Sequence, residues 1–301
     1  MFTGATIRLS TICDELGLTL HRDGDIAYVG KVPTRLERRI VPISTVAHLE
    51  DAASETGIAA YVAPADLVAA IPADAGVIIA DRPMAIAMAI HEHLVSLSGF
   101  LWTDFETQSD ETATIMPGAF VASKNVRIGP MTVVGPNAVV LERTIIGAFC
   151  SIGATSVLGM EAFEQKSGTQ PKQLLRQAGG VMLDDHVTLL AGCTIARSTF
   201  GGFNLIGRET KIDAQTYVAH DCRIGARVTI CACCDISGRV EIGDDAYLGP
   251  NCTITNGVRI GAKATVSLGG VVTQSVPDGM RVTGNFALAH DKWLRLLRDY
   301  R

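Results

Sequence analysis

Histidine and cysteine are the side chains whose spacing in this sequence first suggests chemistry. The chain has seven histidines and eight cysteines. His220 lies in the segment ETKIDAQTYVAHDCRIG, and the residues 18 or 36 positions away are Gly202, Gly238 and Asn256. Histidine is the side chain most often used as a general base. If positions 18 apart are neighbours in space, one imidazole lies between small residues, where a thin extended ligand can bring a reactive end beside it. An exposed corner histidine without a role is the alternative.

The cysteines fit a structural role better than a metal site or a disulfide framework. The run CACC at 231–234 brings three of them together, but no second pair at zinc-ligand spacing occurs. Five of the eight cysteines, one of them in this run, fall at a recurring small position, where a free cysteine acts as a compact hydrophobe: Cys150, Cys193, Cys222, Cys234 and Cys252. We therefore expect no metal ion, and reduced thiols in a cytoplasmic setting.

A period of six residues indicates the elements that must position His220. Twelve consecutive positions are aliphatic when the chain is read every sixth residue from Ile206 to Val272, and the same step runs from Ile128 to Leu158. Neither a helix nor an ordinary strand has this period. It is typical of a β-solenoid whose triangular coils have three six-residue sides, so that about 18 residues make one coil and coils stack about 4.8 Å apart.

Glycines recur directly after the aliphatic positions, and we expect each to supply a turn conformation that is costly for other residues. They are Gly129, Gly135, Gly147, Gly153, Gly159, Gly207, Gly225, Gly243, Gly249 and Gly261. The period fails between Leu158 and Leu183, where the polar segment MEAFEQKSGTQPKQLLRQAGG predicts a loop over 160–181 that leaves the solenoid. Loops on rigid scaffolds often carry function.

The period divides the chain into three predicted parts. Residues 1–105 lack it and predict a small α/β domain with a capped helix at STICDELGLTL and a helix from Pro83 to about Leu97. Residues 106–286 form the solenoid with its loop. Residues 287–301 contain the short amphipathic helix HDKWLRLLRDYR, which suits either a cap on the open end or a docking role.

Composition and charge exclude several classes of protein. The 301 residues are 48% hydrophobic and 19% charged, which excludes disorder, and the net charge of -5 does not support binding to nucleic acid. No export leader or membrane-spanning stretch is indicated, so we expect a cytoplasmic protein. The segment from His220 to Arg301 contains ten Lys and Arg residues but only eight Asp and Glu residues. Its positive net charge would suit the docking of an acidic partner on this part of the chain.

At these residues the chain resembles the hexapeptide-repeat acyltransferases, and within them the UDP-3-O-acylglucosamine N-acyltransferase family of lipid A (lipopolysaccharide) synthesis. The most specific segment is GCTIARSTFGGFNLIGRETKIDAQTYVAHDCRIG, where that family has a TKID run and an Ala-His pair. The resemblance implies a left-handed parallel β-helix (hexapeptide-repeat solenoid) with a small N-terminal α/β domain, here uridine-binding-like, and a short C-terminal helix. It also implies a homotrimer with active sites between subunits.

The resemblance places the catalytic role on His220. It implies substrate-binding roles for Phe163, Lys211, Asp213 and Asp221, and contacts with the donor thioester for Gly238, Asn256, Gly257, Gly284 and Asn285. Several positions depart from the family pattern, which leaves open a paralogue that acts on another nucleotide-linked amino sugar or a shorter acyl group. They are Ala196, Ala214, Tyr217, Asp221 and Gly257.

The leading functional hypothesis is an acyltransferase that moves an acyl group from a phosphopantetheine thioester to the amine of a UDP-linked amino sugar. His220 is the expected general base, and no permanently bound cofactor is expected. Acyl carrier protein and acyl-CoA remain alternative donors. Two other functions stay open: a CoA-dependent O- or N-acetyltransferase of surface polysaccharide synthesis, and a non-catalytic solenoid that binds a nucleotide sugar.

Overall fold

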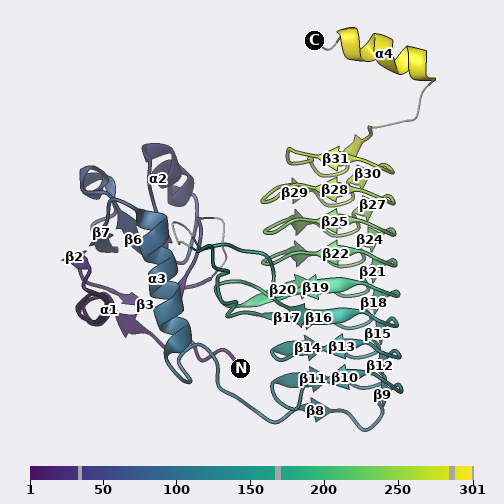
Figure 1. Cartoon of the computed structure of the whole chain (residues 1–301), viewed down its shortest axis with the longest axis horizontal. Coiled ribbons are helices and arrows are strands. Elements are labelled where there is room, and N and C mark those ends of the chain that lie inside the picture. Colours follow the sequence, from purple (N-terminus) through teal and green to yellow (C-terminus); the bar gives the residue numbers. More distant parts are fainter. Residues whose placement is uncertain (33–35, 167–170, 285–288, 300–301) are drawn as a thin grey trace.

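A triangular parallel β-solenoid forms the larger part of the molecule. The computed structural model describes residues 1–32, 36–166, 171–284 and 289–299. Short strands stack into three parallel sheets, one for each side of the triangle. Figure 1 shows the coils stacked from β8 at one end to β31 near the other. The predicted left-handed parallel β-helix is thereby confirmed.

The strands of each side follow one another along the stack. The first side contains β8 (Gln108–Ser109), β11 (Val126–Ile128), β14 (Thr144–Ile146), β17 (Gly180–Leu183), β20 (Phe203–Ile206), β23 (Arg223–Ile224), β26 (Glu241–Ile242) and β29 (Arg259–Ile260). The second contains β9 (Thr114–Ile115), β12 (Val133–Val134), β15 (Ser151–Ile152), β18 (Thr188–Leu189), β21 (Lys211–Ile212), β24 (Thr229–Ile230), β27 (Tyr247–Leu248), β30 (Thr265–Val266) and β32 (Arg281–Val282). The third contains β10 (Phe120–Val121), β13 (Val139–Val140), β16 (Val157–Met160), β19 (Thr194–Ala196), β22 (Tyr217–Val218), β25 (Asp235–Ile236), β28 (Thr253–Ile254) and β31 (Val271–Val272).

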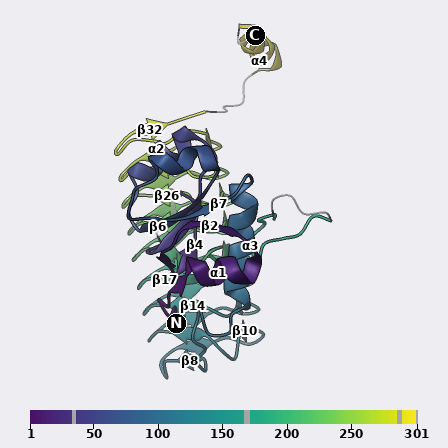
Figure 2. The same ribbon diagram turned by 90° about the vertical axis from the view of Figure 1, so that its left-hand side faces the viewer.

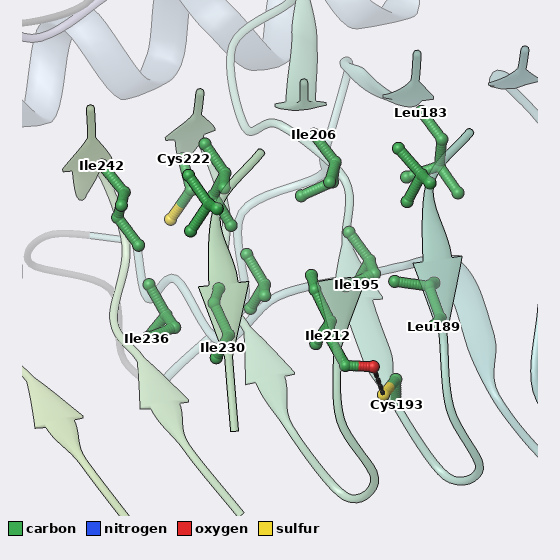
Figure 3. Packing of buried hydrophobic residues seen from close by; sticks show 14 of the residues in the cluster. Leu183, Leu189, Cys193, Ile195, Ile206, Ile212, Cys222, Ile230, Ile236 and Ile242 are labelled. Carbon is green, nitrogen blue, oxygen red and sulfur yellow. Dashed lines mark hydrogen bonds between the residues drawn. The ribbon is translucent and has the colours of Figure 1, made fainter. Parts of the chain in front are cut away.

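The aliphatic residues of the six-residue period fill the interior of the triangle. Register places residues 18 apart side by side, as in the pairing of Ile206 with Ile224 and of Ile212 with Ile230. These side chains are buried and belong to one continuous core that runs through the stack (Figure 3). Stacking identical positions gives every coil the same apolar filling, which explains why the sequence keeps its period so strictly.

The ten glycines that follow the aliphatic positions were expected to supply turn conformations, and this explanation is wrong for nine of them. Of those glycines only Gly159 has a positive φ, at 85°. The left-handed conformation falls instead two residues later, for example on Asn137 (φ 57°) after Gly135 and on Glu209 (φ 62°) after Gly207. The glycines are needed because adjacent coils approach closely: a Cβ on Gly207 would lie 2.5 Å from the carbonyl carbon of Gly225. Close backbone contact, rather than turning, excludes a side chain there.

An α/β domain precedes the solenoid and lies beside it (Figures 1 and 2). Its five-stranded sheet has the order β2-β7-β6-β5-β4, with β2 antiparallel to β7 and the other pairs parallel. The elements are β1 (Ile7–Arg8), α1 (Leu9–Leu16), β2 (Thr19–Arg22), β3 (Asp25–Ile26), β4 (Tyr28–Val29), β5 (Arg39–Pro42), α2 (Val46–Ala53), β6 (Ile58–Ala63), the 3-10 helix η1 (Ala65–Ala70), β7 (Gly76–Ile79) and α3 (Pro83–Ser96).

Helix α1 ends at Gly17, which adopts the left-handed conformation of a C-cap (φ 64°). The helix begins at Leu9, so Ser10 lies inside its first turn, and the residue before the helix makes no side-chain cap. Asp23 replaces the cap, because its carboxylate accepts a hydrogen bond from the Ser10 N–H at 3.0 Å. A carboxylate distant in sequence thus satisfies a backbone donor at the helix N-terminus.

Two insertions in the solenoid join it to the N-terminal domain. Leu158 and Leu183 are inward residues of consecutive sides but lie 25 positions apart instead of six, so 19 residues are inserted between them. Ile195 and Ile206 are 11 apart, which places five extra residues at the next corner. Leu175 and Ala178 of the first insertion and Phe200 of the second are buried in the apolar core of the N-terminal domain.

Helix α4 (His290–Asp299) lies beyond the last coil in both views (Figures 1 and 2). Within the described ranges, no helix is long and apolar enough to cross a membrane.

Candidate active site

His220 lies at the corner where the third side of the solenoid turns toward the first, just after β22. Its side chain is buried, with 5% of the residue exposed. Gly238 occupies the same corner one coil further on, and a Cβ there would lie 2.6 Å from both Cε1 and Nε2 of the imidazole. The small neighbour expected on one side of the ring is therefore in direct contact with it. The absence of a side chain at position 238 makes room for the imidazole.

Asp221 fixes the orientation of the ring. The Nδ1 atom of His220 lies 2.7 Å from Oδ2 of Asp221, and Oδ1 of Asp221 accepts a hydrogen bond from the Thr199 N–H at 3.0 Å. Burial alone would raise the pKa of Asp221, but the hydrogen bonds from His220 and Thr199 outweigh burial and lower it. The ionised carboxylate accepts the Nδ1 proton, so Nε2 is the ring nitrogen that faces the rest of the site.

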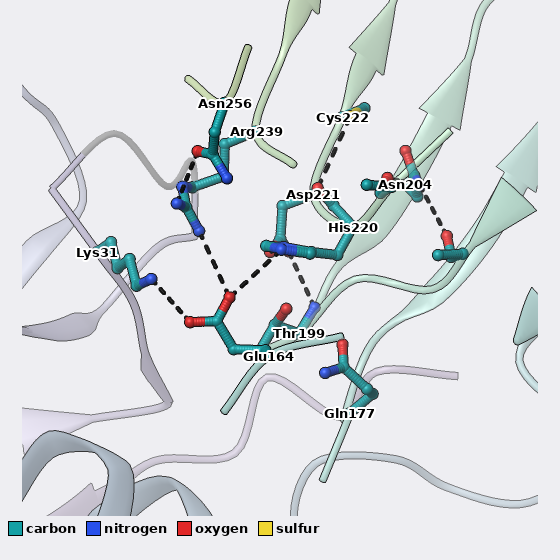
Figure 4. Close-up of polar contacts among 12 residues, drawn as sticks. Lys31, Glu164, Gln177, Thr199, Asn204, His220, Asp221, Cys222, Arg239 and Asn256 are labelled. Atoms are coloured by element: carbon teal, nitrogen blue, oxygen red, sulfur yellow. Dashed lines mark hydrogen bonds and ion pairs between the residues drawn. The ribbon is translucent and has the colours of Figure 1, made fainter. Parts of the chain in front are cut away.

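A carboxylate from the long insertion stands in front of Nε2. Glu164 places Oε2 3.3 Å from the Nε2 of His220 and 4.0 Å from Nη1 of Arg239, while its Oε1 lies 2.9 Å from Nζ of Lys31 (Figure 4). Lys31 belongs to the N-terminal domain, Glu164 to the insertion, and Arg239 and His220 to the solenoid. Three separate parts of the chain therefore meet at one imidazole.

Buried polar atoms without hydrogen-bond partners surround this constellation. They include Oγ1 of Thr199, Oε1 of Gln177 and Oδ1 of Asn204. Asn204 uses its amide nitrogen to donate to the carbonyls of Ala196 and Ala219, next to His220. Unsatisfied buried polar groups are rare and call for an explanation. Several of them around one histidine indicate a site that a polar ligand or water completes.

The residues expected to bind the donor are only partly assembled at His220. Oδ1 of Asn256 accepts a hydrogen bond from Arg239 at 2.7 Å, and the Gly257 N–H donates to the carbonyl of Gly238 at 3.0 Å. Both thus adjoin the Gly238 corner. Gly284 follows β32 and has open space around its Cα. Asn285 lies outside the described residues.

The residues expected to bind the acceptor are more scattered. Phe163 is 73% exposed, although it directly precedes Glu164. Lys211 and Asp213 belong to the second side, where the Lys211 ammonium donates to the carbonyl of His186 and Asp213 accepts from the Ala214 N–H. Within one chain the structure does not bring these two side chains to His220. Only Asp221 of this group contacts the imidazole.

Four residues of the site have no place in the sequence-based expectations: Lys31, Glu164, Thr199 and Arg239. Two of them lie where the six-residue period of the sequence is interrupted, and this interruption could have pointed to them. Glu164 lies in the segment where the period fails, and Thr199 lies in the five-residue shift of phase between Ile195 and Ile206. Arg239 adjoins Gly238, but nothing in its own position marks it. Lys31 comes from a different domain, and no pattern in the sequence relates it to His220.

The cysteines are free thiols, and one of them, Cys222, lies next to the site with its thiol 3.7 Å from the carbonyl of His220. Cys150, Cys193, Cys222, Cys234 and Cys252 are buried. Among the residues that the structure describes, no group of three or more His, Cys, Asp or Glu side chains is placed to hold a metal ion.

Comparison with known proteins gives the class first. The family model of the bacterial transferase hexapeptide (six repeats) matches residues 125–159. This match and the solenoid show that the chain carries the hexapeptide repeat, so the resemblance to hexapeptide-repeat acyltransferases is confirmed.

Curated relatives make the similarity more specific. The UDP-3-O-acylglucosamine N-acyltransferase of Caulobacter sp. (strain K31) is 34% identical over 156 residues, which are 52% of this chain and 46% of that protein. The enzyme of the same name from Herminiimonas arsenicoxydans is 24% identical and covers 94% of this chain and 89% of its own length. An acyl-[acyl-carrier-protein]--UDP-N-acetylglucosamine O-acyltransferase of Verminephrobacter eiseniae (strain EF01-2) is 31% identical over 49% of this chain and 54% of its own. The chain is thus similar to UDP-3-O-acylglucosamine N-acyltransferases, although it spans less than half the length of the Caulobacter relative.

Proposed function

We propose that this protein is an acyltransferase that moves an acyl group from a phosphopantetheine thioester to the amine of a UDP-linked amino sugar, as a lipid A-type enzyme or a paralogue of one. The observation that carries the proposal is the buried His220–Asp221 pair, whose Nε2 faces Glu164 at the junction of solenoid, insertion and N-terminal domain. The names of the relatives support the reaction class.

Each group has a simple part in the proposed mechanism. Asp221 holds the proton on Nδ1, so Nε2 takes a proton from the acceptor as it attacks the thioester carbonyl, and then returns it to the leaving thiolate. The Gly238 N–H is the candidate for holding the oxyanion, because this residue adjoins Nε2 and the neighbouring N–H groups of Arg239 and Gly257 already donate to the carbonyls of His220 and Gly238. A thioester is already activated toward an amine, so the mechanism needs no covalent acyl-enzyme.

The partners follow from the same proposal. The N-terminal domain is the candidate for binding the uridine nucleotide, and it contributes Lys31 to the site. The donor is either acyl carrier protein or acyl-CoA. The segment from His220 onward has ten Lys and Arg residues against eight Asp and Glu residues, and this positive charge suits an acidic carrier protein, mainly by raising its rate of association. Lys211 and Asp213 lie on another side of the solenoid, so they can reach a His220 site only across a subunit boundary, as in the proposed homotrimer.

The test is a panel of UDP-amino sugars assayed with acyl carrier protein thioesters and CoA thioesters in parallel. We expect transfer to at least one amine, and a fall of about 10²- to 10⁴-fold in turnover for His220→Ala. His186→Asn is the matched control, because His186 also lies in a solenoid turn but stacks on Phe149 away from this site. Full activity of His220→Ala refutes the mechanism. Nucleotide-sugar binding without transfer from any thioester favours a binding protein instead.

The oligomeric state is a separate test. We expect a trimer in sedimentation at the concentrations used for assay, and activity that falls when the trimer dissociates on dilution. A fully active monomer contradicts a site shared between subunits.

A further inference from the structure

Glu164 is a residue of the site to which the proposed mechanism gives no part. Only 14% of its side chain is exposed, and it lies across the approach to the Nε2 of His220. Lys31 binds one carboxylate oxygen at 2.9 Å, which aims the other oxygen at the imidazole. A group that comes within hydrogen-bond distance of Nε2 therefore meets Glu164 as well.

The Oε2 atom of Glu164 and the Nε2 atom of His220 are far enough apart to bind one nitrogen of a ligand between them. Oε2 of Glu164 and Nε2 of His220 are 3.3 Å apart, and a third atom can lie about 2.9 Å from both, which is an ordinary hydrogen-bond length. A carboxylate at this point favours a cationic donor over a neutral one. The protonated amine of an amino sugar fits such a position as a donor.

Proton balance separates amines from hydroxyls at such a site. An amine with a pKa near 8 enters mostly as an ammonium group at pH 7. To become an amide it must lose two protons, of which one ends on the departing thiol and one leaves the enzyme. A hydroxyl acceptor loses only one proton, which passes to the thiol, so one imidazole is sufficient for it.

We propose that Glu164 binds the ammonium group of the acceptor and takes its first proton, which makes this site selective for N-acylation over O-acylation. The neutral amine then attacks the thioester carbonyl, so that the C–N bond forms and the C–S bond breaks. His220 takes the second proton from nitrogen and gives it to the thiolate. Glu164 returns its proton to water, and the products are the amide, the thiol and one proton. This inference rests on the proposed acyl transfer to an amine and adds a second proton acceptor to it.

Four charged or titratable groups surround Glu164 and must be kept when Glu164 itself is substituted. They are Lys31, Arg239 and His220, and Asp221 lies behind the imidazole. Glu164→Gln keeps the shape and the hydrogen-bonding oxygen but removes the proton acceptor. Glu161→Gln is the matched control, because Glu161 lies three residues away in the same insertion and is exposed.

The experiment compares the amino sugar nucleotide that the wild type acylates best with its hydroxyl counterpart, over a range of pH. For Glu164→Gln we expect kcat/KM toward the amine to fall about 10²-fold at pH 7. The loss should shrink as the pH rises above the pKa of the free amine, because the acceptor then arrives already neutral. Activity toward the hydroxyl compound and the behaviour of Glu161→Gln should match the wild type.

Three outcomes are distinguishable. An equal loss for amine and hydroxyl, or a loss that does not change with pH, overturns the role of Glu164 while leaving acyl transfer intact. If the wild type does not turn over the hydroxyl compound at all, the pH dependence of the loss in kcat/KM toward the amine tests the role of Glu164 by itself. Failure of the wild type to acylate any amine, in the presence of active thioesters, overturns the proposed function itself. Calorimetric unfolding of each variant checks that the fold is kept.

Discussion

Gly238→Ala probes the site without removing any functional group. The new methyl group would lie 2.6 Å from Cε1 and Nε2 of His220, whereas carbon atoms in contact are normally about 3.5 Å apart. The ring must therefore shift by about 0.9 Å. Because Nδ1 is only 2.7 Å from Asp221, a shift of this size lengthens that hydrogen bond or turns Nε2 away from the acceptor.

A displacement of about 1 Å typically costs about 10²-fold in rate, so we expect turnover of Gly238→Ala to fall by that factor. Overpacking should also lower the free energy of unfolding by about 1–3 kcal/mol. Gly270→Ala is the control, because its methyl group would lie 2.8 Å from the Val266 side chain in another part of the stack. Steady-state kinetics and thermal unfolding of both variants decide the matter. If Gly238→Ala keeps its turnover, or if Gly270→Ala loses as much, the contact with His220 does not govern activity.

Two further predictions concern Asp221 and the cysteines. Asp221→Asn should lower turnover by about 10²- to 10⁴-fold, because an amide no longer fixes the Nδ1 proton, and kinetics at constant pH measure this. Since the pKa of Asp221 is lowered in the folded protein, its contribution to stability is present above its unfolded pKa of about 3.9 and is lost as the pH falls through the folded value. The stability difference between wild type and Asp221→Asn should therefore shrink in acid, and a constant difference from pH 7 to pH 3 would contradict this assignment. Burial raises the pKa of Cys222 to about 12, whereas Cys233 is exposed; iodoacetamide at pH 8 should label Cys233 in the native protein and leave Cys222 unmodified. Mass spectrometry that finds Cys222 labelled first would refute its burial.

The architecture could be predicted from the sequence because a solenoid repeats its local rules in every coil. One aliphatic residue such as Ile224 has the same inward position as Ile206 and Ile242, so a single period determines the sides, the register and the core. The corner position of His220 and its contact with Gly238 follow from the same count of 18. The glycines were predicted in the right places for the wrong reason, because a period reveals position but not the approach of the next backbone.

The rest of the site lies where the period fails. Thr199 and Glu164 come from the two insertions, whose paths depend on apolar anchors such as Leu175 in the core of the N-terminal domain. Lys31 reaches the same point from more than 130 residues away in sequence. Long-range packing between domains brings these groups together, and local patterns do not encode it.

A structure of the protein with the UDP-amino sugar that it acylates and a non-hydrolysable pantetheine thioester analogue tests the central claim most directly. We expect the acceptor nitrogen within about 3.2 Å of the Nε2 of His220, with the thioester carbonyl on its far side and the ring still bound to Asp221. A complex in which the acceptor nitrogen binds elsewhere, with His220 facing only protein or bulk water, would contradict the assignment of this imidazole as the base.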